Sequence, residues 1–478
     1  MLSLPFMRAA ADSILNIQAA EAGPLKLECL EGRVPEGLSG SLLRNGPGRT
    51  ERGGVRYGHP FDGDGFLTRV DFNHGEVTWQ GRWVRTREWQ AEEAAGRILY
   101  RAFGTNRPGG LLPNLLRMRF KNAANTHVVQ HAGRTLALWE GGWPHLIDLD
   151  SLETLGRVHL DGALRNAGPD ALFNPELPFA AHPKLDPETG ELWSFGIAYG
   201  ITNRLMLWIV GPDGQLRERR CVPLTGLPFV HDFVLTRDWA VFVLPAVRFQ
   251  IGRALLGLSA PVQAMSLDQR PGTVLLVPRA GGPAVRIPAP PGFIFHWIHG
   301  WDDDGRVILD GVKYADFPTF DDITALFTPG RAGEAIAQAV RLTVDPASGT
   351  CEEMLLADHP IELPQTTAAL GEPWQVAWAS GAPPERRHPF LSCTLRLERE
   401  QGVTHCRDFG DAVTGEPMPI PAPGGAEWVV QTLHRERSTE LLVLRASDLA
   451  TEARLQLPTP LPPRLHGTWL PREDATGH

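Results

Sequence analysis

The sequence of 478 residues predicts an all-β protein with the radial plan of a β-propeller. An apolar alternating run, a turn rich in Asp, Gly, Ser or Pro, and a second alternating run recur along the chain, which is typical of β-hairpins. They recur at intervals of roughly 60 to 70 residues, as expected for propeller blades with enlarged loops. Long helical periodicity is scarce. In addition, four histidines are scattered over more than half of the chain, and a propeller brings distant strands to one axis.

The hairpin pattern is clearest in five segments, and further strand-like runs lie between them. The five segments are LTRVDFNHGEVTWQG from Leu67, HLIDLDSLETLGRVHL from His145, LMLWIVGPDGQLRERRCV from Leu205, VRLTVDPASGTCEEMLL from Val340 and LLVLRASDLATEARLQL from Leu441. The runs between them include GELWSFGI, WAVFVLPA, TVLLVPR and RVILDGV. Each hairpin supplies two neighbouring strands of a blade.

Composition limits the class of protein. With 50 Gly, 42 Pro and 42% hydrophobic residues, the chain is globular and rich in turns. Its formal charge of −9 gives no broad positive field, which excludes nucleic acid as the expected partner. The five cysteines are odd in number and lack CxxC spacing, so a reducing compartment is expected.

The same chain carries no signal for a membrane span or for secretion. No uninterrupted apolar run reaches about 18 residues. The segment from Leu2 to Leu15 contains Arg8 and Asp12 in the would-be hydrophobic region, which argues against a secretory signal. We therefore expect a cytoplasmic protein with an N-terminal segment over residues 1–24, helical or poorly ordered, and a single propeller domain over residues 25–478.

Three segments depart from the strand pattern and are expected to form a dome over one face of the propeller. They cover residues 88–120, 248–265 and 321–339, and the third is expected to be partly helical. The second is strongly apolar, and an exposed apolar loop is costly in water. It either packs on the propeller or forms an apolar mouth that contacts a membrane or an oily substrate.

Four histidines lie at the rims of apolar runs and form the candidate metal site. His182, His231, His296 and His466 occur in PFAAHPKL, LPFVHDFVL, FIFHWIHGW and PRLHGTWL. Imidazole in such surroundings needs a partner, and a metal is one. Neutral imidazole suits iron, copper, nickel and zinc, and a set without thiolate argues against structural zinc.

Other histidines are expected not to bind this metal. His299 is three residues after His296, and in a regular strand these two side chains point to opposite faces. His127 and His131 lie in a strand-like stretch and are interpreted as non-ligands. His59 precedes Asp62 and Asp64 in GHPFDGDGF, which predicts a tight turn better than a calcium loop.

Three glutamates in apolar surroundings are candidate partners of the histidines. Glu140 follows LALW, Glu362 lies in PIELP and Glu416 lies in TGEPMPIP. A carboxylate that accepts the outer N–H of a metal-bound histidine fixes its tautomer and raises its basicity. The alternative is a surface glutamate at a turn.

These motifs together resemble the carotenoid cleavage oxygenase family, most closely the cyanobacterial-type apocarotenoid oxygenases. The resemblance extends from about Leu25 to Pro471 and rests on blocks in the family's order. They are LKLECLEGRVPEGLSG, LLRNGPG, GHPFDGDGF, RFKNAANT, LALWEGGWPH, AHPKLDP, FVHDFVLT, FIFHWIHGW, VILDG, IELP, GEPMPIP and LHGTWLP.

The resemblance implies a seven-bladed propeller with a dome and one non-haem Fe(II) on the axis. It implies His182, His231, His296 and His466 as the iron ligands, with Glu140, Glu362 and Glu416 as hydrogen-bond partners of three of them. It also implies that Thr126 places its methyl group near an open coordination position. Four aromatic residues match the family's substrate tunnel, although plain core packing is the alternative for each: Phe61, Trp139, Phe229 and Phe295.

The chain departs from the family pattern in three places. His299 and Gly300 stand where the family has an Asn-containing block, so the turn behind His296 is expected to differ. The segment after Glu416 is shorter than usual. The IELPQ block is followed by AWASGAPPERRHP in place of a tyrosine-rich stretch, which affects substrate contacts more than iron binding.

The function implied is cleavage of one C=C bond of a carotenoid or apocarotenoid polyene by O2, giving two carbonyl products. One alternative is cleavage of phenolic stilbenes, which calls for a Tyr and a Lys that hold the phenol. The chain has four tyrosines, and Lys121 is the lysine near a metal block. Two further alternatives are a propeller that binds carotenoid without turnover and a calcium-dependent propeller hydrolase. Nitrogen ligands argue against the latter.

Overall fold

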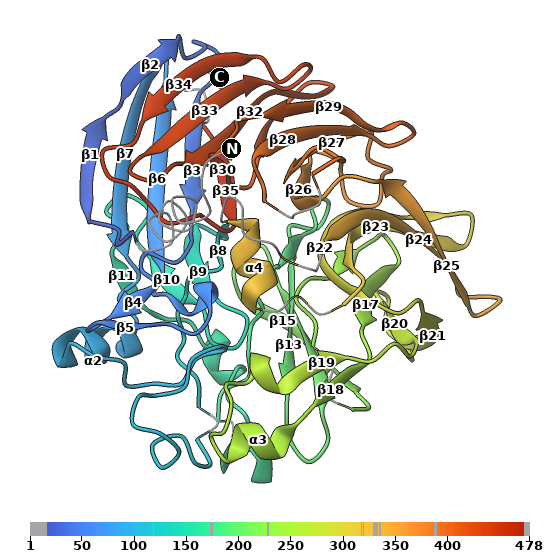
Figure 1. Cartoon of the computed structure of the whole chain (residues 1–478). Coiled ribbons are helices and arrows are strands. Elements are labelled where there is room, and N and C mark those ends of the chain that lie inside the picture. The colour runs from blue at the N-terminus through green and yellow to red at the C-terminus, as the bar shows by residue number, and fades with distance from the viewer. Residues whose placement is uncertain are drawn as a thin grey trace.

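The computed structural model describes residues 17–472 except 118, 173–174, 227–228, 317, 319, 328–332, 334–335 and 387–389. Within these residues, seven sheets of four to six strands stand in a ring around a common centre (Figure 1). Their strands pair antiparallel, and the predicted seven-bladed propeller is confirmed.

Three sheets come from the first half of the chain, apart from one strand that the C-terminal end adds, and each carries one strand at the axis. From the axis outward, their strands are β35 (Gly467–Pro471), β3 (Gly40–Arg44), β6 (Phe66–Asn73), β7 (Glu76–Trp83) and β1 (Ala22–Lys26); β8 (His127–His131), β9 (Arg134–Leu138), β10 (His145–Ile147) and β11 (Thr154–Arg157); and β12 (Lys184–Leu185), β13 (Leu192–Ala198), β14 (Arg204–Val210) and β15 (Leu216–Pro223).

The next three sheets repeat this order from the axis outward. Their strands are β16 (Val234–Leu235), β17 (Trp239–Leu244), β20 (Gly272–Pro278) and β21 (Val285–Ala289); β22 (Phe293–Asp303), β23 (Arg306–Tyr314), β24 (Ala337–Asp345) and β25 (Thr350–Ala357); and β26 (Ile361–Thr366), β27 (Val376–Gly381), β28 (Cys393–Glu398) and β29 (Gly402–Asp408).

The seventh sheet and the first close the ring by joining the two ends of the chain. The seventh contains β30 (Val413–Thr414), β31 (Met418–Ala422), β32 (Gly425–His434), β33 (Thr439–Arg445), β34 (Thr451–Gln456) and β2 (Glu28–Gly32). Here the N-terminal β2 pairs with β34, and in the first sheet the C-terminal β35 pairs with β3. Two ends of the chain thus complete the circle together.

The predicted hairpins form neighbouring strands of the blades. The five segments become the pairs β6–β7, β10–β11, β14–β15, β24–β25 and β33–β34. Strands such as β14 are buried on both faces because each sheet packs between two others, so they are almost entirely apolar instead of alternating. Phe195, Phe233 and Phe242 illustrate this packing, since they form one aromatic cluster between the third and fourth blades.

Short helices and two small ribbons lie outside the blades (Figure 1). They are α2 (Arg87–Ala95), α3 (Ile251–Leu255), α4 (Phe320–Leu326), the ribbon of β4 (Glu51–Arg52) and β5 (Val55–Arg56), and the ribbon of β18 (Val247–Phe249) and β19 (Met265–Leu267). The hydroxyl of Thr86 caps α2 by accepting a hydrogen bond from the N–H of Trp89, and Gly96, with φ of 61°, ends it.

These extra elements occupy the three segments that the sequence set apart. Segment 88–120 contains most of α2, segment 248–265 contains α3, and segment 321–339 contains α4 and the first residues of β24, with part of it outside the described residues. Of the predicted N-terminal segment, residues 1–16 lie outside the described residues and β1 begins at Ala22. No helix in the described part of the chain is long and apolar enough to cross a membrane.

Two of these segments together expose a group of apolar side chains, here called the dome patch. The N–H of Leu116 donates a hydrogen bond of 2.8 Å to the carbonyl oxygen of Leu255, so the two segments lie side by side. The exposed members of the dome patch are Leu111, Leu112, Leu115, Leu116, Ile251, Leu256 and Leu258.

Candidate metal centre

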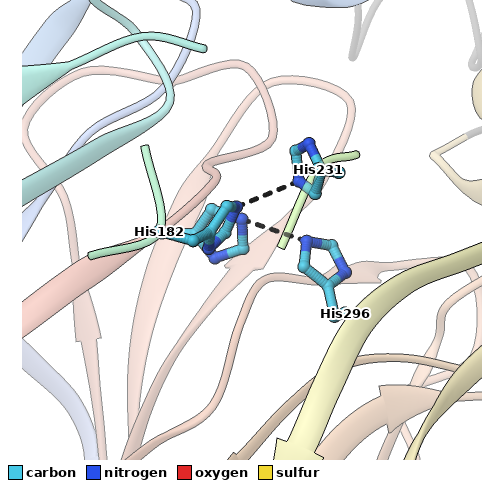
Figure 2. Close-up of side chains that lie close together, drawn as sticks. His182, His231 and His296 are labelled. Atoms are coloured by element: carbon cyan, nitrogen blue, oxygen red, sulfur yellow. Dashed lines mark hydrogen bonds between the residues drawn. The ribbon is translucent and has the colours of Figure 1, made fainter. Parts of the chain in front are cut away.

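The four predicted histidines converge at the centre of the ring. His296 lies in β22, and the other three come just before β12, β16 and β35, the innermost strands of their blades. Each side chain is buried, and the ligand atoms of all four lie within 4.8 Å of one another. Figure 2 shows the rings of His182, His231 and His296 pointing toward one another.

The closest approaches are between Nε2 atoms. They are 3.0 Å apart in His182 and His231, and 3.2 Å apart in His296 and His466. The Nδ1 atom of His296 lies 2.6 Å from Glu362 Oε2, and that of His466 lies 2.8 Å from Glu416 Oε1. Since a carboxylate only accepts hydrogen bonds, both Nδ1 atoms carry a hydrogen and both Nε2 atoms present lone pairs.

This tautomer pattern is the observation that tests whether a cation fits. Two lone pairs that face each other at 3.2 Å repel, unless a positive ion lies between them. Four neutral imidazole nitrogens around one point are donors that suit divalent iron and neighbouring transition metals. The donor set therefore fits a single non-haem iron.

Burial also favours, in three of these histidines, the neutral form that a ligand requires. Burial, followed by the charges of the neighbouring histidines, lowers the pKa of His182 and of His231 well below the usual value. Burial lowers the pKa of His466 as well, although Glu416 opposes the shift. Metal binding at these groups therefore does not compete with protons at neutral pH.

The three predicted glutamates all lie beside histidine Nδ1 atoms, but their own surroundings differ. Burial would raise the pKa of Glu416, yet His466 and Arg44 outweigh it and lower that pKa to about 2. Arg44 is itself buried and donates to both the carboxylate and the backbone carbonyl oxygen of Glu416. Gln365 donates a further hydrogen bond of 2.7 Å.

The other two carboxylates carry less compensation. Glu362 accepts hydrogen bonds from the hydroxyl of Tyr314 at 2.9 Å and from the N–H of Leu363 at 2.8 Å. Glu140 Oε1 lies 3.3 Å from His231 Nδ1 but has no partner with hydrogen-bond geometry among the described residues. Burial and the nearby charge of Asp232 raise the pKa of Glu140 well above its usual value.

Two of the predicted tunnel residues form an aromatic side of the site, and one of them, Phe295, borders the histidines. The ring of Phe295 stacks on His231, with centroids 4.3 Å apart and an interplanar angle of 16°. Phe229 stacks on Phe103 at 5.7 Å and also contacts Phe293. A flat apolar surface therefore leads up to the metal position.

The other two predicted tunnel residues are placed differently. Phe61 packs against the apolar cluster that includes Ile323 of α4, and its ring lies 4.8 Å from that of His59. Trp139 is half-buried at the end of β9, where its ring lies so close to Gly141 that a Cβ there would come within 2.8 Å. In the described structure, neither residue contacts the rings of the four central histidines directly.

Thr126 lies next to the histidines through its backbone. Its carbonyl oxygen accepts a hydrogen bond of 3.1 Å from the N–H of His466, and the residue is buried. The hydroxyl donates to Asn125 Oδ1 at 3.2 Å. The predicted role, with the methyl group toward an open coordination position, stays a prediction.

A cavity of about 460 Å³, lined by polar and apolar residues alike, lies on the propeller axis, and the sequence did not predict it. We call it the axial cavity, because residues of the innermost strands β8, β12, β22, β26, β31 and β35 line it. His182, His296 and His466 reach into it, whereas none of the phenylalanines of the aromatic side lines it. The metal position therefore has two unlike surroundings, one aromatic and one that mixes polar and apolar side chains.

His299 lies in the axial cavity and not among the four histidines. Its Nε2 lies 3.1 Å from the carbonyl oxygen of Ala369. The expectation that His296 and His299 face opposite sides of a regular strand was wrong in its geometry, because both line one cavity. The register of β22 shifts on either side of Trp297, so strict alternation does not hold there.

His127 is the neighbour whose role the sequence analysis missed. Its Nδ1 lies 2.8 Å from the carbonyl oxygen of Ala181 and its Nε2 lies 3.2 Å from that of Gly467. It thus links the chain beside His182 with the chain beside His466. The motif THVVQH holds no local sign of this, because both partners are far away in sequence. His131 likewise bonds to a backbone carbonyl oxygen, that of Gly190.

The acidic turn near His59 is structural, as expected. Asp62 accepts hydrogen bonds from the N–H of Gly104 and the hydroxyl of Thr105. Asp64 lies 2.7 Å from the ammonium group of Lys121, which also contacts Glu92 at 3.1 Å.

Lys121, the lysine that phenolic binding would call for, is part of this ion cluster. It is fully buried, and its ammonium group also lies 2.9 Å from the hydroxyl of Tyr57. This one Tyr and Lys pair belongs to the ion cluster with Asp64 and Glu92. The chain thus lacks, at this lysine, the free pair that stilbene binding would need.

Comparison with known proteins identifies close relatives. Residues 16–471 match the family model described as retinal pigment epithelial membrane protein. The chain is 32% identical over 462 residues to apocarotenoid-15,15'-oxygenase of Synechocystis sp., covering 93% of this chain and 92% of that protein. It is 27% identical to isoeugenol monooxygenase of Pseudomonas nitroreducens, covering 95% and 96% of the two chains.

A solved structure agrees with these relationships. The crystal structure of cobalt-substituted Synechocystis apocarotenoid oxygenase superposes with a TM-score of 0.88 at 31% identity, covering 98% of this chain and 99% of that one.

Proposed function

Because this chain belongs to the retinal pigment epithelial membrane protein family, which includes the apocarotenoid oxygenases, we propose that it is a non-haem Fe(II) dioxygenase of apocarotenoids or carotenoids. It breaks one C=C bond of the polyene with O2 and gives two carbonyl products. The observation that carries this proposal is the convergence of four buried histidines beside an aromatic surface. The overall reaction places one oxygen atom in each product and needs no external reductant.

The four histidines would hold the iron, and the three glutamates would hold the histidines. Ferrous iron bound there would supply the redox chemistry that activates dioxygen. Glu362 and Glu416 keep the hydrogens on Nδ1, so that the Nε2 lone pairs remain directed at the metal position. We assign Glu140 the same task at His231, with a weaker hold, since its contact lacks hydrogen-bond geometry.

The aromatic residues would position the polyene. Phe295 and Phe229 offer flat faces that orient a rigid conjugated chain beside the metal position, and such faces stabilise positive charge that develops on it. We also assign Phe61 and Trp139 to the tunnel walls farther from the histidines, and Thr126 to the open side of the metal position. A hydrophobic polyene is thus the substrate class that suits this side of the site.

Comparing polyenes with phenolic substrates tests this proposal. The purified chain, loaded anaerobically with one equivalent of Fe(II), is exposed to air with a panel of apocarotenals and, separately, with isoeugenol and a hydroxystilbene. We expect paired aldehyde products, identified by mass, from the apocarotenals. Turnover of the phenolic compounds alone would overturn the substrate assignment, and iron binding without any turnover would favour a carotenoid-binding role.

We further propose that the dome patch contacts a membrane from which the substrate is taken. Its leucines come from two adjacent segments, and Leu112 is 84% exposed. Burying one such side chain in the lipid interface contributes about 2 kcal/mol. Binding to phosphatidylcholine vesicles should therefore weaken in Leu112→Ser and Leu116→Ser. Ile201→Ser is the matched control, because Ile201 is 88% exposed and lies between β13 and β14, outside the dome patch. Equal binding by all three variants would contradict the proposal.

A further inference from the structure

We propose that the axial cavity is the route by which the metal ion enters and leaves the four histidines, and that Lys184 and Asp232 regulate passage. This inference rests on the proposed function insofar as it assumes that the histidines bind a divalent metal. It adds a second entrance to the site, separate from the aromatic side, with residues of its own.

A metal ion that approached the histidines along the aromatic side would meet a high desolvation cost. A hydrated dication keeps its water shell unless polar groups replace it, and transfer of an ion into an apolar surrounding is strongly unfavourable. Phe295 borders the histidines there, and Phe293, Phe229 and Phe103 follow it in a chain of ring contacts. None of these side chains offers an oxygen or nitrogen donor. A surface that suits a polyene therefore opposes a metal ion.

The axial cavity differs from the aromatic side, because polar side chains stand among its apolar lining residues. Side chains of Gln130, Thr366, Gln365 and His299 line it and can replace water around a passing ion. Three of the four histidines reach into it. The lining also includes Leu185, which is 51% exposed, and Pro421, so the cavity opens to solvent.

An ion pair stands within this route. Lys184 Nζ lies 2.8 Å from Asp232 Oδ1; the lysine side chain is 30% exposed and that of the aspartate is 4% exposed. Lys184 comes two residues after His182, and Asp232 comes directly after His231. Asp232 is fixed by hydrogen bonds from the N–H groups of Phe233 and Trp297. The lysine is the more exposed partner and can turn toward solvent, which leaves a carboxylate facing the ion.

The charge of Lys184 lies near the histidines. Lys184 comes two residues after His182, its partner Asp232 directly follows His231, and both line the axial cavity. A divalent metal on its way to these histidines is repelled by the positive charge of Lys184. The route therefore offers polar groups but carries an electrostatic barrier.

Metal exchange kinetics tests this proposal without measuring turnover. Co(II) uptake by the metal-free full-length protein is followed by its visible absorption, and release is followed by transfer to a chelator. In Thr367→Trp, a bulky side chain in the cavity lining should slow uptake and release by the same factor and leave the Kd unchanged. In Lys184→Met, loss of the barrier should speed uptake about tenfold, and added salt should reduce the gain.

Leu112→Trp serves as the control on the dome, and its exchange rates should equal those of the unmodified protein. A changed Kd in Thr367→Trp would indicate a distorted site. In that case Gln130→Trp, which places a bulky side chain elsewhere in the cavity lining, replaces it in the test. If Thr367→Trp, Gln130→Trp and Lys184→Met all still bound Co(II) and kept unchanged exchange rates, the proposed route would be overturned. A failure of all proteins to bind Co(II) would instead contradict the four-histidine metal site.

Discussion

The aromatic side and the axial cavity surround the same four histidines and differ in almost every property. Phe295 and its neighbours present stacked rings, and the cavity presents amides, hydroxyls, an imidazole and an ion pair. An extended apolar substrate and a hydrated metal ion have opposite solvation needs, and one entrance cannot serve both well. The difference teaches that substrate chemistry and metal exchange can use different sides of one site, although both sides serve four ligand atoms that lie within 4.8 Å of one another.

The buried charges next to the axial cavity provide the largest expected effect. Arg44→Met leaves the Glu416 carboxylate buried without its cation, which should lower the free energy of unfolding by about 3 to 5 kcal/mol. Arg454→Met is the matched control, since this arginine is one-third exposed beside Glu440 and should cost less than about 1 kcal/mol. Urea denaturation of the metal-free proteins measures both. Equal losses of unfolding free energy in the two variants would mean that the buried ion pair of Arg44 and Glu416 adds no special stability beside the axial cavity.

On the aromatic side, Asp62 lies beside Phe103 in surroundings that disfavour charge. Burial raises its pKa to about 6, against the opposing effect of Thr105 and Gly104. Because the folded-state pKa exceeds the unfolded value, the native protein loses stability relative to Asp62→Asn as pH rises from about 4 to 6. The difference between the two proteins should change by about 3 kcal/mol across that window. Unfolding experiments at several pH values that gave a constant difference would contradict a desolvated Asp62.

Substitution of the carboxylates that orient the histidines should change metal affinity alone. Glu362→Gln removes the charged acceptor at His296 Nδ1, so metal affinity should fall about 10- to 100-fold. Competition with a chelator measures the Kd, and Glu352→Gln on exposed β25 is the control. If Glu362→Gln bound the metal as tightly as the control, the assignment of this glutamate to His296 would fail.

The smallest expected effect belongs to the substrate side. Phe295→Leu removes the flat face beside His231, which should cost about 1 kcal/mol and lower kcat/KM for an apocarotenal roughly fivefold. The Kd for Co(II) should not change, in contrast to Glu362→Gln. Phe409→Leu, remote from the site, is expected to alter neither quantity. A Phe295 variant that lost metal affinity and kept its kcat/KM per bound metal would contradict the assignment of the aromatic side to the substrate.

The strands and the histidines could be predicted because their signals are local. Alternation and turn residues mark hairpins such as β6 and β7, and each of the four histidines stands beside an apolar run. The number of blades was an inference from family resemblance, since loops of unequal length hide the repeat.

The interactions across the site could not be predicted, because they join residues that are remote in sequence. Arg44 lies 372 residues from Glu416, and nothing in the motif LLRNGPG indicates that the two residues pair. Lys184 and Asp232 belong to neighbouring blades, so the ion pair exists only once these two blades pack together. The shared cavity of His296 and His299 depends on irregular register in β22, which period-two reasoning does not detect.

Isotope labelling tests the central claim most directly. The protein loaded with Fe(II) is supplied with an apocarotenal and ¹⁸O₂, and both carbonyl products are reduced at once to alcohols, which stops exchange with water, and weighed by mass spectrometry. The account predicts one ¹⁸O atom in each of the two fragments. Label in only one fragment would indicate monooxygenase chemistry, and unlabelled products would show that dioxygen is not the source of the carbonyl oxygens.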